Sequence, residues 1–340
     1  MFTQLLAIAR NTFYESIRQP VVLVVLTVAT LLIVLSNPFA AFTMQDDQRM
    51  FVDIGLSTVF ICGTLLAAFL ATNVVNREIE NRTALTVISK PVARMPFVVG
   101  KYIGVAGAIV LAVLYMGLVF VLVERHGTLQ TVRTPYHLPV ILFGLGGLAL
   151  ALAVGVWCNY FYGKVFSSTV LFAATPLLIV GYVLSMLFKA DFSADTIARA
   201  FRGDLWLAIG SMGIALLVLT AVAVAASTRL GQVLTVAVTL GVFMLGMLSD
   251  WLFGRPAAHL AEAVQRGNLP LTDFMHIKYL AMSALYWIVP NFQVFWLSDA
   301  ITQGRPIPLA YMSTLVPYGL LQIGAALAIA VALFESREVG

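Results

Sequence analysis

Long stretches without a charged residue or a histidine dominate the pattern of hydrophobic and polar positions along this chain. A helix that crosses the hydrocarbon core of a membrane needs about 20 mostly apolar residues. Eight stretches approach or exceed this length, at residues 21–36, 54–75, 102–123, 138–157, 165–188, 205–227, 230–249 and 310–334. The first is short, and only Thr228 and Arg229 separate the sixth from the seventh. The pattern predicts an all-α polytopic membrane protein with one transmembrane domain at residues 21–340.

Residues 1–20 have a different pattern, in which apolar positions recur at helical spacing. The apolar positions are Phe2, Leu5, Leu6, Ala9, Phe13 and Ile17, and the opposite face carries Gln4, Asn11, Glu15 and Arg18. This arrangement is typical of an amphipathic helix that lies along a membrane surface. We expect such an elbow helix on the inner surface, ended by Pro20, and not a cleaved signal peptide.

The composition supports the membrane assignment. Hydrophobic residues make up 61% of the 340 residues and charged residues 11%, whereas soluble domains have about 45–50% and about 25%. So few charges cannot cover a water-facing surface of this size. The two cysteines, Cys62 and Cys158, are too far apart in the sequence to suggest a disulfide framework or a Cys/His metal site.

The charges predict the orientation of the chain in the membrane. An even number of spans places both termini on one side, and basic residues gather on the cytoplasmic side. With cytoplasmic termini, the inner segments hold ten basic and five acidic residues, and the longer outer loops hold ten basic and eleven acidic ones. Both termini are therefore expected in the cytoplasm, with Arg125 and Arg133 in an outer loop. The net charge of +4 then reflects topology and not binding to nucleic acid.

The sequence offers no catalytic or metal centre. The histidines are scattered over outer segments, which favours surface positions over a metal or pH-sensing site; they are His126, His137, His259 and His276. Zinc-protease, nucleophile-elbow and phosphate-loop motifs are missing. We expect that the chain is not an enzyme and holds no cofactor, so that a partner subunit must hydrolyse any ATP that drives it.

Two stripes of small residues predict close contacts between helices. Gly147, Ala151 and Gly155 lie four residues apart in the fourth span, and Gly100, Gly104 and Ala108 do so at the start of the third. Small residues let helix backbones approach closely in a membrane. Packing within one bundle is favoured over a dimer interface.

The inner segment at residues 76–101 differs from its surroundings. A charged start is followed by an apolar stripe at helical spacing, Leu85, Ile88 and Val92, which Pro91 interrupts. The pattern predicts a short amphipathic helix between the second and third spans. Because Glu78 and Glu80 stand beside basic residues, this helix suits a protein groove of mixed charge better than an anionic lipid surface.

This segment resembles the permeases of the ABC-2 transporter family. The matching run goes from Glu78 through Arg82-Thr83 and Ser89-Lys90-Pro91-Val92-Ala93-Arg94 to Gly100-Lys101-Tyr102-Ile103-Gly104. Weaker similarities lie in the elbow, at Arg10-Asn11-Thr12-Phe13, and in Tyr286-Trp287-Ile288-Val289-Pro290-Asn291-Phe292 before the last span. Ala93 occupies a position at which serine is common in the family. The eight predicted spans also exceed the six of many members, so the order of the helices cannot be taken over from the family.

The resemblance implies that this segment is a coupling helix that docks on a cytoplasmic ATPase. It assigns the contact to Glu78, Glu80, Arg82, Thr83, Lys90, Pro91 and Arg94. It further implies a permease of the bacterial plasma membrane, working as a dimer with a second copy or a paralogue. Two separate ATPase subunits would bind ATP and magnesium, and export is favoured over import.

Other functions stay open at this point. The chain could be a non-transporting membrane anchor or a mechanotransmission subunit of a larger complex. A gradient-driven carrier is less favoured, because the span interiors contain no Asp, Glu, His, Lys or Arg, although sodium sites can be built from backbone carbonyls. The sequence does not identify the substrate.

The outer segment at residues 250–309 is expected to contain two short helices, at residues 256–264 and 273–289, separated by Gly267-Asn268-Leu269-Pro270. Its aromatic residues favour a position at the outer membrane interface. The segment could be a lid or a docking platform for an extracytoplasmic partner, and a cap over the outer end of the bundle is slightly favoured.

Overall fold

The computed structural model describes residues 2–40, 47–80, 94–127, 136–267, 270 and 273–335, without the side chains of residues 40, 74–80 and 94. Within these ranges the chain is almost entirely helical, and the regular elements are all helices. They are α1 (Phe2–Ile17), α2 (Pro20–Ala40), α3 (Asp47–Glu80), α5 (Arg94–His126), α6 (Leu138–Val140), η1 (Ile141–Leu145), α7 (Gly146–Tyr162), α8 (Phe166–Leu187), α9 (Ile197–Ala200), α10 (Gly203–Ser227), α11 (Gln232–Ser249), η2 (Asp250–Gly254), α12 (Arg255–Gly267), α13 (Phe274–Ile288), η3 (Gln293–Phe295), α14 (Ser298–Thr302) and α15 (Leu309–Glu335).

The eight predicted spans are confirmed, since the described part of the chain contains eight helices long and apolar enough to cross a membrane. The helices extend beyond the charge-free stretches, and α3 begins at Asp47 instead of residue 54. Charged residues are tolerated in the end turns because these can lie outside the hydrocarbon core. The seventh span also continues beyond its predicted end, through the π-helical turn η2 into α12.

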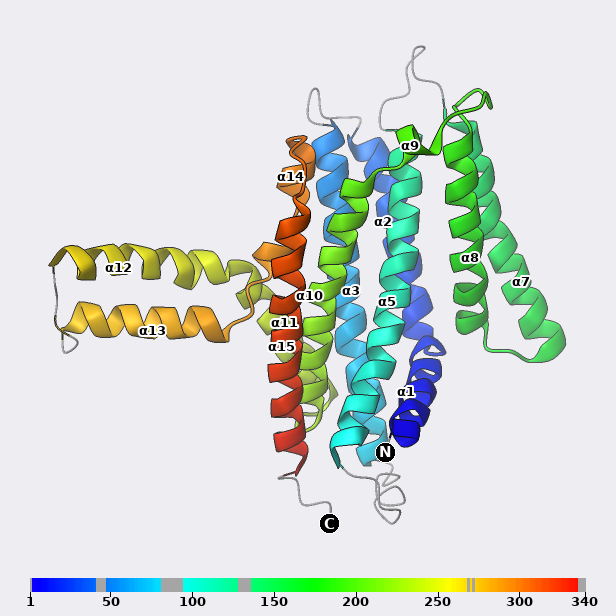
Figure 1. Ribbon diagram of the computed structural model, residues 1–340. Coiled ribbons are helices and arrows are strands. Elements are labelled where there is room, and N and C mark those ends of the chain that lie inside the picture. Colours follow the sequence, from blue (N-terminus) through cyan, green and yellow to red (C-terminus); the bar gives the residue numbers. More distant parts are fainter. Residues whose placement is uncertain are drawn as a thin grey trace.

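Three helices form the centre of the bundle (Figure 1). Of the eight spans, α3, α5 and α10 have the largest shares of buried residues, whereas α7 and α15 are largely exposed. Phe51 of α3 stacks on Phe120 of α5 with 5.4 Å between the ring centroids, and the Phe120 ring occupies the space beside Gly55. The start of α1 and the end of α15 lie at the same end of the bundle (Figure 1), as an even number of spans requires.

Both small-residue stripes pack within the bundle, as predicted. A Cβ atom added to Gly104 would lie 2.6 Å from the carbonyl oxygen of Ala9, so the backbones of α1 and α5 are in direct contact. The space beside Gly155 in α7 is filled by the side chain of Val170 in α8.

The α7–α8 pair stands at one side of the bundle, and the α12–α13 pair, hereafter the lateral hairpin, projects from the other (Figure 1). A cap over the outer end, the slightly favoured expectation, is not what the structure has. The two helices of the hairpin themselves lie where the sequence predicts them.

The predicted helix at the N-terminus is confirmed, and its contacts explain part of the distribution of its apolar and polar residues. Ala9, Thr12, Ser16 and Ile17 are buried. Phe2, by contrast, is 71% exposed, and Leu6 is also exposed. The face that meets α5 also includes Ile8 and Phe13, which lie against Gly100 and Gly107 of α5, while Phe2 and Leu6 lie outside this contact.

Candidate functional site

The predicted coupling residues lie at the border of the described structure. Glu78 and Glu80 continue α3 as helical backbone, and Arg94 begins α5, but the side chains of these three are not described. Arg82, Thr83, Lys90 and Pro91 lie outside the described residues. The coupling helix therefore stays a prediction. The structure shows only where the flanking helices stop: α3 ends and α5 begins at the end of the bundle that holds the start of α1 and the end of α15 (Figure 1).

At this terminal end, the junction of α1 and α2 borders an open, polar cavity of about 590 Å³. Its lining residues are Asn11, Tyr14, Glu15, Arg18, Gln19, Pro20, Val21 and Asn73. The amide of Asn73 donates a 2.9 Å hydrogen bond to Gln19 Oε1, which ties α3 to the residue between α1 and α2. Gln232 at the start of α11 donates in turn to Asn73 Oδ1 over 3.5 Å. Three separate segments are thereby joined beside the end of α3.

Lys101, near the start of α5, is buried at this end of the bundle. It is one of the basic residues expected on the inner side, and its side chain is only 2% exposed. The ammonium lies 4.0 Å from Glu15 Oε2 and 5.7 Å from the centroid of the Phe97 ring. Burial of a lysine requires such partners. Gly100 and Gly104 were the feature of the sequence that could have indicated this burial, because they let α1 lie directly over Lys101.

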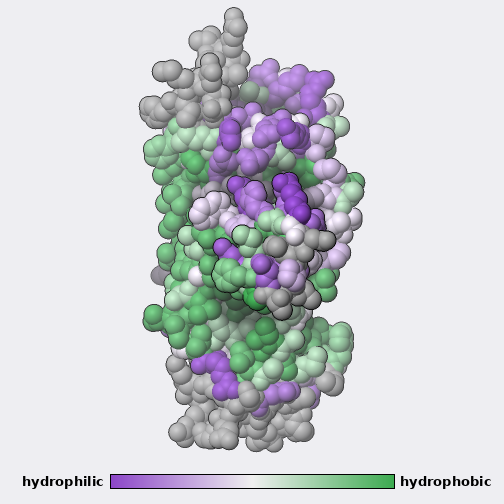
Figure 2. Space-filling model, turned by 90° about the vertical axis from the view of Figure 1, so that its left-hand side faces the viewer, coloured by the Kyte–Doolittle hydropathy of each residue, from purple (hydrophilic) through white to green (hydrophobic). Residues whose placement is uncertain are grey.

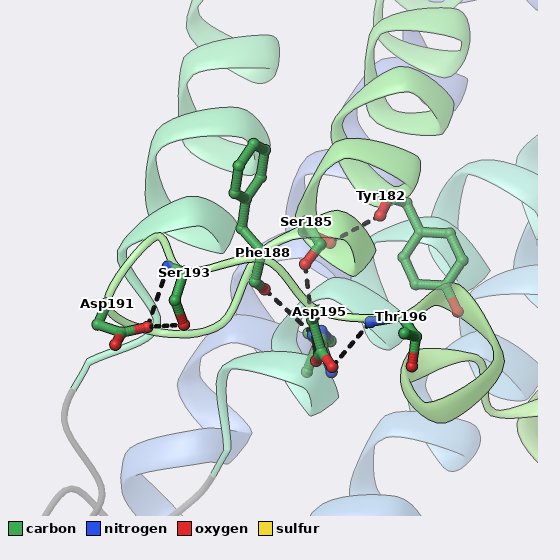
Figure 3. A network of polar contacts seen from close by, with 8 residues as sticks. Tyr182, Ser185, Phe188, Asp191, Ser193, Asp195 and Thr196 are labelled. Carbon is green, nitrogen blue, oxygen red and sulfur yellow. Dashed lines mark hydrogen bonds and ion pairs between the residues drawn. The ribbon is translucent and has the colours of Figure 1, made fainter.

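The opposite end of the bundle is held by a second polar network, around Arg125 at the end of α5. Its guanidinium donates to the carbonyl oxygens of Ser185 and Phe188, at 3.4 and 3.2 Å, and to Asp195 Oδ2 at 3.1 Å. Figure 3 shows Ser185, Phe188 and Asp195 converging there. The expectation of a loop residue is wrong for Arg125, whose side chain is only 17% exposed. Its partners lie at least 60 residues away in the chain, and the pattern of charges gives no sign of them.

Two further groups complete this network. Arg202 bridges Glu124 and Asp204, with an oxygen of each carboxylate at 2.8 Å. The side chain of Asp195 accepts the backbone N–H of Thr196, and this bond, followed by the contact with Arg125, holds the pKa of Asp195 below its usual range. The network fixes the connection from α8 to α10, residues 188–202, on the end of α5.

His137 lies close to this network and is also misplaced by the sequence analysis. The residue is buried rather than at the surface. Burial, together with the neighbouring positive charge of Arg125, lowers the pKa of His137 to about 4. Among the described residues no group of three or more His, Cys, Asp or Glu could hold a metal ion.

A comparison with known families finds a match to the N-terminal part of the chain, somewhat less than half of its length. A family model described as ABC-2 family transporter protein matches residues 6–161, which confirms the resemblance found in the sequence. The match includes α1, the first three spans, most of the fourth, and the predicted coupling segment. No curated protein matches the chain. The protein is thus a multi-pass membrane protein whose residues 6–161 are similar to ABC-2 family transporter proteins.

Proposed function

Because residues 6–161 match the ABC-2 transporter family, we propose that the protein is the permease subunit of an exporter driven by separate cytoplasmic ATPase subunits. The observation that carries the proposal is the extent of the match, which includes both the elbow helix and the whole segment between α3 and α5. The absence of a phosphate-binding loop from the sequence is consistent with ATP hydrolysis in a partner.

The positions of α3 and α5 support a direct transmission of movement from the ATPase, through the coupling segment, to the core of the bundle. Both helices flank the coupling segment and both belong to the buried centre of the bundle. A displacement of the segment therefore moves the core and not a peripheral helix. Close-packed interiors transmit such displacements because they deform little. ATP binding closes the ATPase pair, and each bundle then shifts as a largely rigid body within a dimer of two permease copies or paralogues.

The cytoplasmic side of the membrane follows from the same proposal. The ATPase must meet the segment at residues 76–101, so the end of the bundle that holds the termini faces the cytoplasm of a bacterial cell. The end with the Arg125 network then faces outward. This orientation agrees with the excess of basic over acidic residues in the inner segments.

The test is a double charge reversal in the predicted contact, Glu78→Lys with Arg82→Glu. Truncating one partner of a buried charge pair in an interface costs about 2–5 kcal/mol, so the ATPase should no longer co-purify with the permease, or should hydrolyse ATP without coupling to it. Glu262 and Arg266 form a matched control, since they have the same spacing, are ion-paired at 3.0 Å and lie exposed on α12. Their reversal should leave association and ATPase stimulation unchanged.

Full association and full ATPase stimulation of the Glu78/Arg82 variant would show that the coupling assignment is wrong. Transport in liposomes separates the proposed function from the alternative of a mechanotransmission subunit. A mechanotransmission subunit would respond to the ATPase but move no substrate, whereas activity without any ATPase would indicate a gradient-driven carrier.

A further inference from the structure

A hollow of about 170 Å³, hereafter the flank groove, lies between α2 and the α7–α8 pair. Ten of its fourteen lining residues are aliphatic, and the other four carry hydroxyl groups. α7 packs chiefly on α8, whereas α2 packs on α3 and α5, so α2 and α7 form opposite walls. Leu31 and Leu152 are about half exposed at the rim, and Tyr115 and Leu171 are buried at the floor. The groove is therefore open on one side and deep on the other.

The four hydroxyl groups of the groove all have acceptors or donors inside the protein. Thr27 and Thr30 each donate to the carbonyl four residues earlier, at 2.8 Å. Tyr115 Oη lies 3.0 Å from Thr30 Oγ1 and is the donor of this pair, because the threonine proton is already used. Ser167 Oγ donates to the carbonyl of Arg18 at 3.0 Å. The lining side chains thus offer no donor to an occupant, and a peptide or sugar there would leave its own acceptors unpaired.

An apolar chain is the occupant that these walls suit. A dry engineered cavity of about 150 Å³ with apolar walls takes up a small apolar molecule and no water, and the flank groove has a similar volume. On the side with the lateral hairpin, hydrophobic residues dominate the bundle surface between hydrophilic residues nearer its two ends (Figure 2). Beside the groove, Val24, Leu150 and Val154 are likewise exposed. Lipid therefore surrounds the opening, and an acyl chain can enter from it.

One end of the groove, hereafter its mouth, lies where α2 and α8 begin. The bond from Ser167 to the carbonyl of Arg18 places Arg18 at this mouth, and Lys164 precedes Ser167 by three residues. The backbone at Lys164 is fixed, since Gly163 ends α7 with a φ of 60° and the side-chain amide of Asn159 donates to the Lys164 carbonyl at 2.8 Å. Both basic side chains are exposed. The mouth therefore presents two positive charges to the membrane surface.

The surroundings of the mouth fit a lipid headgroup. The nearby carboxylate of Glu15 lies 4.0 Å from the ammonium of Lys101, so its charge is already balanced. Exposed aromatic residues in the last turns of α7, Trp157, Tyr160 and Tyr162, are typical of a membrane–water interface. The mouth is thus at headgroup level, and the rest of the groove extends from it toward the acyl chains.

We propose that the flank groove binds one acyl chain of an anionic phospholipid whose headgroup lies at Arg18 and Lys164. Because one acyl chain merely replaces another, the headgroup decides which lipid stays. Each basic residue near the membrane surface favours an anionic lipid by about fivefold, and a zwitterionic lipid gains less. The bound lipid lies in the leaflet on the side of the chain termini. This is the inner leaflet if the termini are cytoplasmic, a clause that rests on the proposed function, whereas the site itself does not.

The experiment uses the purified full chain in nanodiscs of phosphatidylcholine and phosphatidylglycerol in equal amounts. A trace of phosphatidylglycerol with a photoreactive diazirine in its acyl chain is added, or the same probe with a choline headgroup, and cross-linked peptides are identified by mass spectrometry. Arg18→Gln with Lys164→Gln removes the charges, and Arg10→Gln, at another exposed arginine, is the control. Thr27→Phe fills the groove from its exposed side, and Val24→Phe, on the same helix but outside the lining, is its control.

We expect the phosphatidylglycerol probe to label residues 148–152 and 167–174 several times more strongly than the choline probe. This preference should fall about fivefold for each charge lost at positions 18 and 164 and should persist in Arg10→Gln. Thr27→Phe should remove the labelling of both segments, and Val24→Phe should not.

Equal labelling by the two probes would overturn the proposal, as would a preference that survives the loss of both charges. An absence of labelling in the wild type, or cross-links to a second copy in its place, would also overturn it. If Thr27→Phe does not fold, the charge variants still decide, because they alter exposed side chains only. No ATPase is present, so these outcomes are distinct from a failure of the proposed function.

Discussion

Arg125 at the end of α5 lies 3.1 Å from Asp195 Oδ2, although 70 residues separate them in the chain. The same guanidinium also reaches two backbone carbonyls of the α8 C-terminus. One side chain therefore joins the end of a central helix to the connection between two others.

Replacement of this arginine should loosen the end of the bundle opposite the chain termini. In an Arg125→Ala variant the carbonyls of Ser185 and Phe188 lose their charged donor, and a hydrogen bond to a charged group contributes about 1.5–3 kcal/mol. We expect a lower unfolding temperature in detergent and faster proteolysis at residues 188–202. Arg125→Lys should recover only part of the loss, because an ammonium cannot match the planar fork of arginine. Unchanged stability of Arg125→Ala would mean that the network does not hold the connection.

The contact between α1 and α5 can be tested at Gly104. In Gly104→Ala the new methyl group would meet Thr12 and the carbonyl of Ala9, 2.5 and 2.6 Å away. Overpacking of this kind costs about 1–3 kcal/mol, so we expect a lower unfolding temperature and easier proteolytic removal of α1. Gly210→Ala in α10 is the control, because no atom lies within 4 Å of its added Cβ. Equal behaviour of the two variants would contradict the close contact.

Acid should destabilise the protein through His137. Its pKa is about 4 in the folded protein and about 6.5 when exposed, so the unfolded chain binds more protons between these values. Stability is therefore lost as the pH falls below about 6.5, by up to about 2 kcal/mol at pH 5. A His137→Gln variant should lose less stability than the wild type between pH 7 and pH 5, measured by thermal unfolding. The exposed His259, changed to Gln, serves as the control.

The orientation of the chain is tested by labelling single cysteines with a membrane-impermeant maleimide in intact cells. Gln130→Cys, Ser193→Cys and Gln265→Cys should react from outside. Asn81→Cys and Ser336→Cys should react only after the cells are opened. Labelling of position 81 from outside would reverse the topology and remove the basis for an ATPase contact there.

The spans were predictable from the sequence, because a helix that crosses the hydrocarbon core of a membrane must have a minimum length and contain few charged residues. The lateral hairpin was predictable only as two helices, since Gly267 and Pro270 mark the break between them. Its direction depends on Asn291 meeting Tyr318, 27 residues further on. The burial of Lys101 and of Arg125 depends likewise on partners 86 and 70 residues away. Local periodicity carries no information about such pairs. The coupling residues themselves were inferred from the family resemblance, and they stay a prediction.

The backbone contact at Gly104 also determines what α1 can report. Because no side chain separates the carbonyl of Ala9 from the start of α5, the two helices cannot slide past each other without a collision, and α1 follows any tilt of α5. Phe2 and Leu6 on the far side are exposed and take no part in this contact. A fluorophore attached at position 2 would thus move together with α1 and would report small rotations of the buried α5.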